Sequence, residues 1–210
     1  MKERYITLAG EASAEIIEKR SRFIATVKPV ETEAEALAFL NDLRQKYWDA
    51  THNVYAYVLE ENQLARYSDD GEPGGTAGMP VLDILQREGL SNLIVVVTRY
   101  FGGTLLGTGG LVHAYSKSAK AGIEAAGKLE MILCKELVLD CEYTLWGILQ
   151  NQLSKFPDLI QGEALYTEKV SLPLYLPVGE VEAFSRHMID QLNGQITIAQ
   201  GEEKYCGRKL

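Results

Sequence analysis

Cysteine is scarce in this sequence, and its placement argues against the usual cysteine-based sites. The 210 residues include three cysteines, Cys134, Cys141 and Cys206, an odd number without Cys-x-x-Cys spacing. A disulfide framework and a zinc knuckle are therefore not expected, and the thiols are predicted to be reduced and structural. No His-x3-His or paired-ligand spacing occurs either. We therefore predict no metal and no cofactor.

Long hydrophobic runs are also lacking. No apolar stretch approaches the roughly 18 residues that a membrane-spanning helix needs. The first residues, Met1–Tyr5, lack the apolar core of a signal peptide. The sequence therefore predicts a cytoplasmic protein without a membrane partner.

An excess of positive charge is the third absence. The net charge is −8, from 21 Lys and Arg against 29 Asp and Glu. Coating nucleic acid through bulk charge is disfavoured, because such binding needs clustered cations. Residues 1–135 hold 15 Lys and Arg against 18 Asp and Glu, and residues 136–210 hold 6 against 11. The first part is the better candidate for binding a polyanion at a local patch.

The composition is otherwise that of a folded protein. Hydrophobic residues make up 46% and charged residues 24% of the chain, which disfavours disorder. The pattern predicts an α+β fold that begins with strands. Thr32–Glu35 matches a capping box, and the helix that follows is expected to run to about Trp48. Leu93–Val97 is a continuous apolar run, typical of a strand buried on both faces.

The last third of the chain has its own regularity. A strand near Leu137–Cys141 is followed by a helix, two strands, a second helix and a last strand at Ile196–Ile198. This β-α-β-β-α-β order is the pattern of a ferredoxin-like domain. We therefore predict two domains, residues 1–135 and 136–210.

Two glycine-rich loops are the most unusual local feature. Each follows a predicted strand and precedes a predicted helix, so its backbone N–H groups could face an anion. Neither loop completes a P-loop or a dinucleotide-binding motif. The loop residues singled out are Asp69, Asp70, Glu72, Gly75 and Thr76 in the first, and Gly102, Gly103, Gly107 and Gly109 in the second.

Several short motifs resemble those of the YigZ/IMPACT family. They are Ser21-Arg22-Phe23-Ile24, His52-Asn53, Ser68-Asp69-Asp70-Gly71-Glu72-Pro73, Gly75-Thr76-Ala77-Gly78, Arg99-Tyr100-Phe101-Gly102-Gly103 and Leu106-Gly107. The resemblance covers residues 1 to about 128. The remainder is similar to the family's bacterial C-terminal domain in length and in the order of strands and helices.

The resemblance implies a fold and a class of partner. The first domain is expected to be related to a ribosomal small-subunit protein domain and to domain IV of elongation factor G, with an unusual left-handed β-α-β crossover. The ferredoxin-like domain would correspond to domain V. Eukaryotic relatives regulate translation by binding a partner of a stress-responsive kinase. RNA, the ribosome or a translation-related protein is therefore the expected partner.

The candidate anion and RNA contacts are cations near a predicted strand junction, before the first loop and at the end of the buried strand. They are Lys19, Arg20, Arg22, Arg66 and Arg99, together with the backbone of Gly102 and Gly103. Three such contacts to single-stranded RNA predict a salt dependence with a slope of about −2. The alternative for Arg66 or Arg99 is a fork with a carboxylate of the first loop, from Asp69, Asp70 or Glu72. Either role, or both, fits the sequence.

Aromatic and catalytic roles are less well supported by the sequence. Tyr100 or Phe101 could stack on a base, with the other expected in the core, because adjacent strand residues face opposite sides. His52, Ser68 and Asp69 are the residue types of a hydrolytic triad, a weaker reading than ordinary hydrogen bonding.

The function that these features favour is a translation-linked binding protein, whose first domain contacts RNA, the ribosome or a translation factor. One alternative is an enzyme, such as a hydrolase, for a small phosphorylated or carboxylate substrate held at the glycine-rich loops. The other is a purely protein-binding module.

Overall fold

The computed structural model describes residues 2–210 and divides the chain into two compact units. Unit 1 contains Tyr5–Glu130 and the short segment Arg208–Leu210, and unit 2 contains Lys2–Arg4 and Met131–Gly207. The division falls inside the strand β7 (Lys128–Cys141), which continues from one unit into the next. A strand that crosses the division explains why no linker composition marks it. In the part of the chain described, no helix is long and apolar enough to span a membrane.

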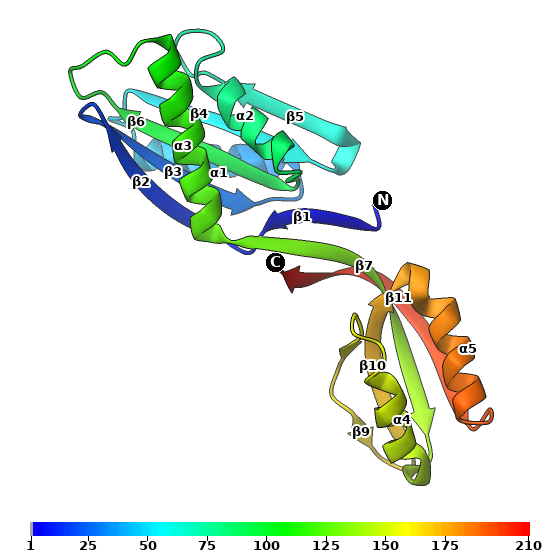
Figure 1. The fold of residues 1–210 in the computed structure, drawn as a ribbon. Helices are drawn as coiled ribbons and strands as arrows, with labels where there is room; N and C mark the ends of the chain where they lie inside the picture. The colour runs from blue at the N-terminus through cyan, green and yellow to red at the C-terminus, as the bar shows by residue number, and fades with distance from the viewer. Residues whose placement is uncertain (1) are drawn as a thin grey trace. The chain divides into compact units, whose positions relative to one another are not determined.

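Unit 1 is built on a five-stranded antiparallel sheet with the order β2-β3-β6-β4-β5 (Figure 1). Its central strand carries the run Leu93–Val97, which is fully buried as predicted. A further strand, β1, bridges to this unit in parallel through Ile6 and Leu90. The strands are β1 (Arg4–Leu8), β2 (Ala12–Glu18), β3 (Ser21–Pro29), β4 (His52–Leu59), β5 (Leu64–Ser68) and β6 (Leu93–Tyr100).

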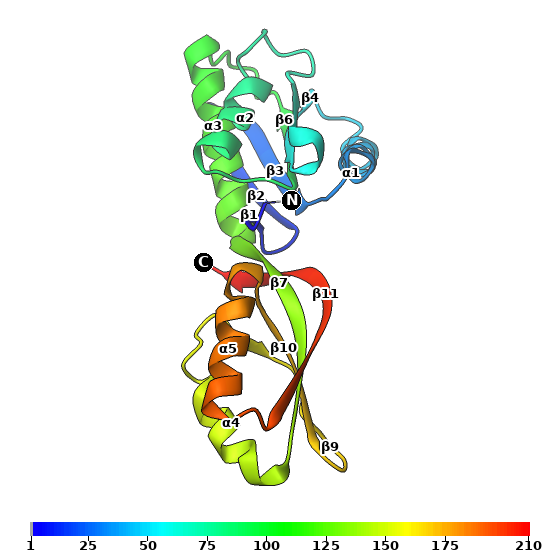
Figure 2. The ribbon, with the colours of Figure 1, turned by 90° about the vertical axis from the view of Figure 1, so that its right-hand side faces the viewer.

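Three helices cover the two faces of this sheet, α1 (Glu33–Lys46) on one and α2 (Gly78–Arg87) with α3 (Thr108–Ala126) on the other (Figure 2). Side chains of β6 alternate between the two resulting cores. Ile94 and Val96 pack with the α1 side, whereas Val95 and Val97 pack with the α2 and α3 side. Thr32 caps α1 by accepting a hydrogen bond from the backbone N–H of Glu35, as the capping box predicts.

The strand order requires one left-handed crossover. Because all neighbouring strands are antiparallel, β3 and β4 are parallel to each other, and so are β5 and β6. The two connections are β3-α1-β4 and β5-α2-β6. They cross the sheet in opposite directions, and their strands also point in opposite directions. The two connections therefore have the same hand only if their helices lie on the same face of the sheet. Helices α1 and α2 lie on opposite faces. One connection is therefore left-handed, against the strong right-handed preference.

Unit 2 has two helices and a sheet in the order β7-α4-β8-β9-β10-α5-β11, with the central pair β7 and β10 and with one short strand more between the helices than was predicted. Strand β11 pairs with β7, while β8 and β9 pair with β10. Leu149, Phe184 and Met188 are buried in its core. The helices and strands are α4 (Trp146–Leu153), β8 (Ile160–Gln161), β9 (Leu165–Tyr166), β10 (Val170–Pro177), α5 (Val181–Gln191) and β11 (Ile196–Lys209). Short 3-10 turns occur at Glu61–Gln63, Tyr143–Leu145 and Val178–Glu180.

Candidate functional site

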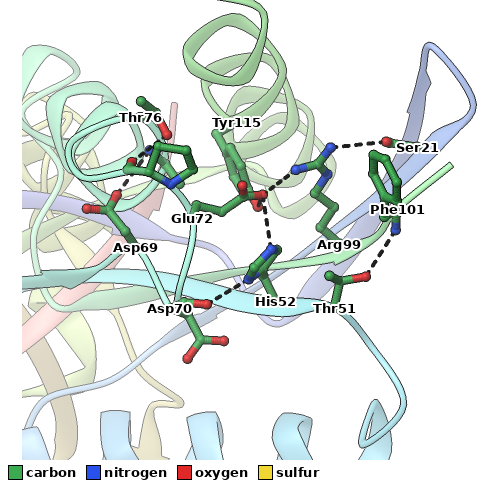
Figure 3. Close-up of polar contacts among 12 residues, drawn as sticks. Ser21, Thr51, His52, Asp69, Asp70, Glu72, Thr76, Arg99, Phe101 and Tyr115 are labelled. Atoms are coloured by element: carbon green, nitrogen blue, oxygen red, sulfur yellow. Dashed lines mark hydrogen bonds and ion pairs between the residues drawn. The ribbon is translucent and has the colours of Figure 1, made fainter. Parts of the chain in front are cut away.

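A buried ion pair lies at the end of the unit 1 sheet, where the two glycine-rich loops meet (Figure 3). Glu72, from the first loop, accepts hydrogen bonds at Oε1 from Arg99 Nη1 at 2.5 Å and from the Tyr115 hydroxyl at 2.7 Å. Burial, reinforced by the carboxylate of Glu72, raises the pKa of Tyr115 well above its usual value. The tyrosine therefore stays neutral and donates a hydrogen bond to the carboxylate.

Arg99 is held on several sides. Its Nη2 donates to Ser21 Oγ at 3.2 Å, and its guanidinium carbon lies 5.3 Å from the ring centre of Phe23 and 5.6 Å from that of Phe101. These are cation–π distances. Its Nε is buried and donates to no acceptor within residues 2–210. Of the two roles considered for Arg99, the pairing with a carboxylate of the first loop is the one present, and the carboxylate is that of Glu72.

His52 lies directly opposite Arg99 on the neighbouring strand. Its Nδ1 lies 2.7 Å from the carbonyl oxygen of Asp70. Because a carbonyl only accepts, Nδ1 carries a proton, and Nε2 is the ring nitrogen that the loop carbonyl leaves available. Nε2 lies 3.8 Å from Glu72 Oε1. The imidazole thus presents one nitrogen, whose orientation is fixed by the first glycine-rich loop.

The first glycine-rich loop is organised by Asp69. Its two carboxylate oxygens accept from the backbone N–H groups of Gly75, Ala77 and Gly78, at 2.8, 3.1 and 2.8 Å. These groups lie at the beginning of α2, where a carboxylate is favourable. Thr76 donates from Oγ1 to the carbonyl of Pro73. These three amides therefore bind a carboxylate of the chain itself, Asp69.

Asp70 fastens the same loop to its surroundings. Its Oδ2 accepts from the backbone N–H of Asn53 at 2.6 Å, and its Oδ1 accepts from Arg44 at 3.1 Å. Arg44 lies on α1 and was not singled out from the sequence. Asp70 thus pairs with an arginine other than the two predicted, through a single nitrogen of Arg44.

The second glycine-rich loop contacts the β2–β3 hairpin closely. A Cβ on Gly102 would lie 2.0 Å from the backbone carbon of Arg20, and the Gly102 N–H donates to Ser21 Oγ. Gly103 and Gly107 adopt positive φ angles of 78° and 76°, which favour glycine. Gly109 lies in the first turn of α3 without a close neighbour. The glycines therefore serve tight packing and turns.

A cavity of about 360 Å³ opens between the two loops. Its apolar wall includes Phe101, Leu105 and Leu111, and its polar lining residues are Thr51, His52, Glu72, Arg99 and Thr108. Phe101 is 47% exposed and Leu105 is 84% exposed. Tyr100 is partly exposed, and its hydroxyl bonds to Asp49. The expectation that Tyr100 or Phe101 enters the core is therefore wrong, because the strand ends at the sheet margin.

The other candidate cations lie outside this cavity. Lys19 and Arg20 form the exposed tip of the β2–β3 hairpin, with φ angles of 44° and 68°. Arg22 pairs with Glu15 at 2.8 Å, and Arg66 donates to the carbonyl of Ala65. Within residues 2–210, no ion pair joins Arg66 to a carboxylate of the first loop. All four side chains are exposed, and Lys19 and Arg20 are the two for which no partner is present in the described part of the chain.

The weakly predicted triad does not form. Asp69 is occupied by backbone N–H groups, and Ser68 Oγ accepts from the backbone N–H of Asp70. His52 bonds to a carbonyl instead of either side chain. No cluster of His, Cys, Asp and Glu suited to a metal occurs in the described residues. The sequence did not predict that Tyr115 and Ser21 bond to the Glu72–Arg99 pair.

Comparisons with known proteins agree with the short motifs. The family model described as Impact N-terminal domain matches residues 19–123, and a domain of unknown function, DUF1949, matches residues 139–195. The chain is 39% identical over its whole length to IMPACT family member YvyE of Bacillus subtilis, covering 97% of that protein. This chain belongs to the IMPACT family. The resemblance read from the sequence is thereby confirmed.

Other relatives fit the same family. IMPACT family member YigZ of Escherichia coli is 34% identical over 88% of this chain and 92% of its own length. The Protein IMPACT homolog of Dictyostelium discoideum is 41% identical over 47% of this chain and 29% of its own length. A solved structure described as that of a hypothetical protein superposes with a TM-score of 0.61 at 32% identity, covering 97% of this chain and all of the other.

Proposed function

We propose that this IMPACT family member is a translation-linked binding protein, and that unit 1 binds single-stranded RNA at the end of its sheet. The role in translation rests on the family resemblance. The choice of RNA rests on the surface around Phe101. Arg99 is committed to Glu72, so the phosphate contacts are assigned to the exposed hairpin tip, Lys19 and Arg20, with Arg22 beside it.

The half-exposed ring of Phe101 is the observation that carries this proposal. It lines the cavity and is backed by the Arg99 guanidinium, which fixes its position. Bases stack on such rings irrespective of sequence, at about 1–3 kcal/mol per base. The cavity adds His52 and Thr108 as hydrogen-bonding groups at its wall. A base on Phe101 would have polar partners within the same cavity.

Fluorescence anisotropy with a labelled 15-nucleotide oligouridine tests the proposal. Phe101→Ala should weaken binding about tenfold, as expected for the loss of one stacked base. Three phosphate contacts predict a salt slope of about −2, and Lys19→Ala/Arg20→Ala should reduce it to about −0.7.

Lys169→Ala/Arg186→Ala is the matched control, because it removes two exposed cations from unit 2. It should leave both affinity and slope unchanged. The site would be refuted if Phe101→Ala left the affinity for oligouridine unchanged and the two double variants changed it equally. No binding at 50 mM salt would refute RNA as the ligand.

A second function, acid–base chemistry on a small substrate, is favoured by one observation. His52 holds its Nδ1 proton against a carbonyl and directs Nε2 toward Glu72 in the cavity wall. A nitrogen fixed in this way is suited to accept a proton. Screening phosphorylated and carboxylate compounds by ligand-observed NMR tests this function. A ligand lost in His52→Ala but retained in Phe101→Ala would support the enzyme over the RNA-binding protein.

The finer structural identities are proposals as well. We propose that unit 1 shares its fold with domain IV of elongation factor G, and that unit 2 is a ferredoxin-like accessory binding module. The left-handed connection supports the first assignment, and the strand order β11-β7-β10-β8 supports the second. The domain limits at residues 135 and 136 and a cytoplasmic location remain predictions of the sequence.

A further inference from the structure

A second hollow lies in unit 1, on the face covered by α2 and α3. It has a volume of about 550 Å³ and is bordered by α2, α3 and β2. Its least exposed lining residues are three aliphatic ones, Ile16, Ile84 and Ala121, together with Ser116. Along α3 it begins at His113, which is about 8 Å from the start of that helix at 1.5 Å per residue. It shares no lining residue with the cavity at Phe101 and is therefore a separate groove.

Three cations stand at the rim of this groove. Arg87, Lys117 and Lys120 are exposed lining residues, and no hydrogen bond or ion pair of their side chains is present within residues 2–210. Glu124 is the acidic residue in the same lining. Three positive charges against one negative make the groove locally cationic, in a chain whose net charge is −8. Cations without partners on an acidic protein are available to an acidic ligand.

The floor of the groove indicates which acidic ligand fits. Nucleic acid bases bind by stacking on aromatic rings or guanidinium planes. The two such groups in the lining, His113 and Arg87, are exposed at the rim, and the floor itself is aliphatic. Aliphatic side chains on a floor and charges on a rim form the usual composition of a peptide-binding groove. On α3, the lining residues Lys117, Lys120, Ala121 and Glu124 follow the spacing of one helix face. A helical or extended peptide could follow this face.

We infer that the groove between α2, α3 and β2 binds an acidic amphipathic segment of a partner protein. Apolar side chains of that segment contact Ile16, Ile84 and Ala121. Its carboxylates pair with Arg87, Lys117 and Lys120. This surface is separate from the proposed RNA site, so an IMPACT family member of this type would join a protein partner to an RNA.

Selection from a random 16-residue peptide display library tests the inference with the full chain as bait. Wild-type protein should enrich peptides that combine Asp or Glu with Leu, Ile or Phe at helical spacing. A synthetic peptide from that set should bind at least tenfold more weakly to Lys117→Glu/Lys120→Glu. Both substitutions are at exposed positions, and an unchanged thermal midpoint confirms that the fold is retained.

Lys155→Glu/Lys169→Glu is the control, because it changes the net charge by the same amount in unit 2. It should bind the peptide as the wild type does. Enriched peptides without acidic residues, or equal weakening in both double variants, would overturn the inference. Oligouridine that displaces the peptide from wild type and loses affinity in Lys117→Glu/Lys120→Glu would overturn it in favour of a nucleic-acid groove. If Phe101→Ala did not weaken oligouridine binding, that result would contradict the proposed RNA site but not the proposed peptide groove.

Discussion

Arg99 Nη1 lies 2.5 Å from Glu72 Oε1, and the two side chains are only 6% and 4% exposed. The pair joins the last residues of the central strand to the first glycine-rich loop. Burial of a charge is costly unless it is paired and hydrogen-bonded, so each member depends on the other. The cavity wall around Phe101 depends on the pair because Arg99 stacks against that ring.

Arg99→Ala should therefore destabilise unit 1 by about 3–5 kcal/mol, since it leaves the Glu72 carboxylate buried without its cation. Urea unfolding measures the loss. Arg66→Ala, at an exposed arginine, should cost less than about 0.5 kcal/mol. In a double-mutant cycle, Arg99→Ala/Glu72→Ala should cost less than the sum of the single variants. Strict additivity would contradict the coupling.

Gly102→Ala should disrupt the junction between the second glycine-rich loop and the β2–β3 hairpin. The added Cβ would lie 2.0 Å from the backbone carbon of Arg20, so backbone must move. We expect a loss of about 3 kcal/mol or more in the free energy of unfolding. Gly74→Ala is the control, because nothing lies within 4 Å of its Cβ position and its φ is not positive. Similar midpoints for the two variants would contradict the close approach.

Much of the fold was predictable from local patterns. The apolar run Leu93–Val97 and the N-cap at Thr32 each depend on neighbouring residues alone, and both predictions are confirmed. The second half of the capping box differs, because the Glu35 carboxylate accepts from the backbone N–H of Glu31. Strand β11 was predicted at Ile196–Ile198 but extends to Lys209. Its later residues are mostly polar and exposed, so they carry no hydrophobic periodicity from which a strand could be recognised.

The site was less predictable, because its contacts join distant parts of the chain. The sequence offered Arg66 and Arg99 as equal partners for three carboxylates, and only the fold decides that Arg99 meets Glu72. Tyr115 fitted the apolar face of its helix, and nothing in that pattern revealed its bond to Glu72. The helical spacing of apolar residues predicts which side chains are buried, but it does not predict which group a buried hydroxyl bonds to.

Asp69→Ala should loosen the first glycine-rich loop. It removes the acceptor for three backbone N–H groups, those of Gly75, Ala77 and Gly78, at the start of α2. Hydrogen bonds to charged groups contribute about 1.5–3 kcal/mol each, and partial access of water reduces the sum, so a loss of about 3 kcal/mol is expected. Hydrogen exchange at these amides should accelerate. Asp83→Ala, at an exposed position of α2, should leave their exchange unchanged.

Tyr115→Phe should reveal how the buried hydroxyl responds to pH. Burial beside Glu72 raises the pKa of Tyr115, so the folded protein keeps a proton that the unfolded chain releases above pH of about 10. Its contribution is fully present below that pH and declines as the pH rises further. Wild type should exceed Tyr115→Phe by about 2 kcal/mol at pH 8, from the hydrogen bond to the carboxylate.

Between pH 10 and pH 11 this advantage should fall by up to about 1.4 kcal/mol, the value of one proton over one pH unit. Urea unfolding of both proteins from pH 8 to pH 11 measures it, and other groups that titrate in this range cancel in the difference. Tyr67→Phe, at a tyrosine that is 40% exposed, should follow wild type throughout. A difference between wild type and Tyr115→Phe that stays constant with pH would mean that Tyr115 ionises as readily in the folded protein as in the unfolded chain, which its buried bond to Glu72 does not permit.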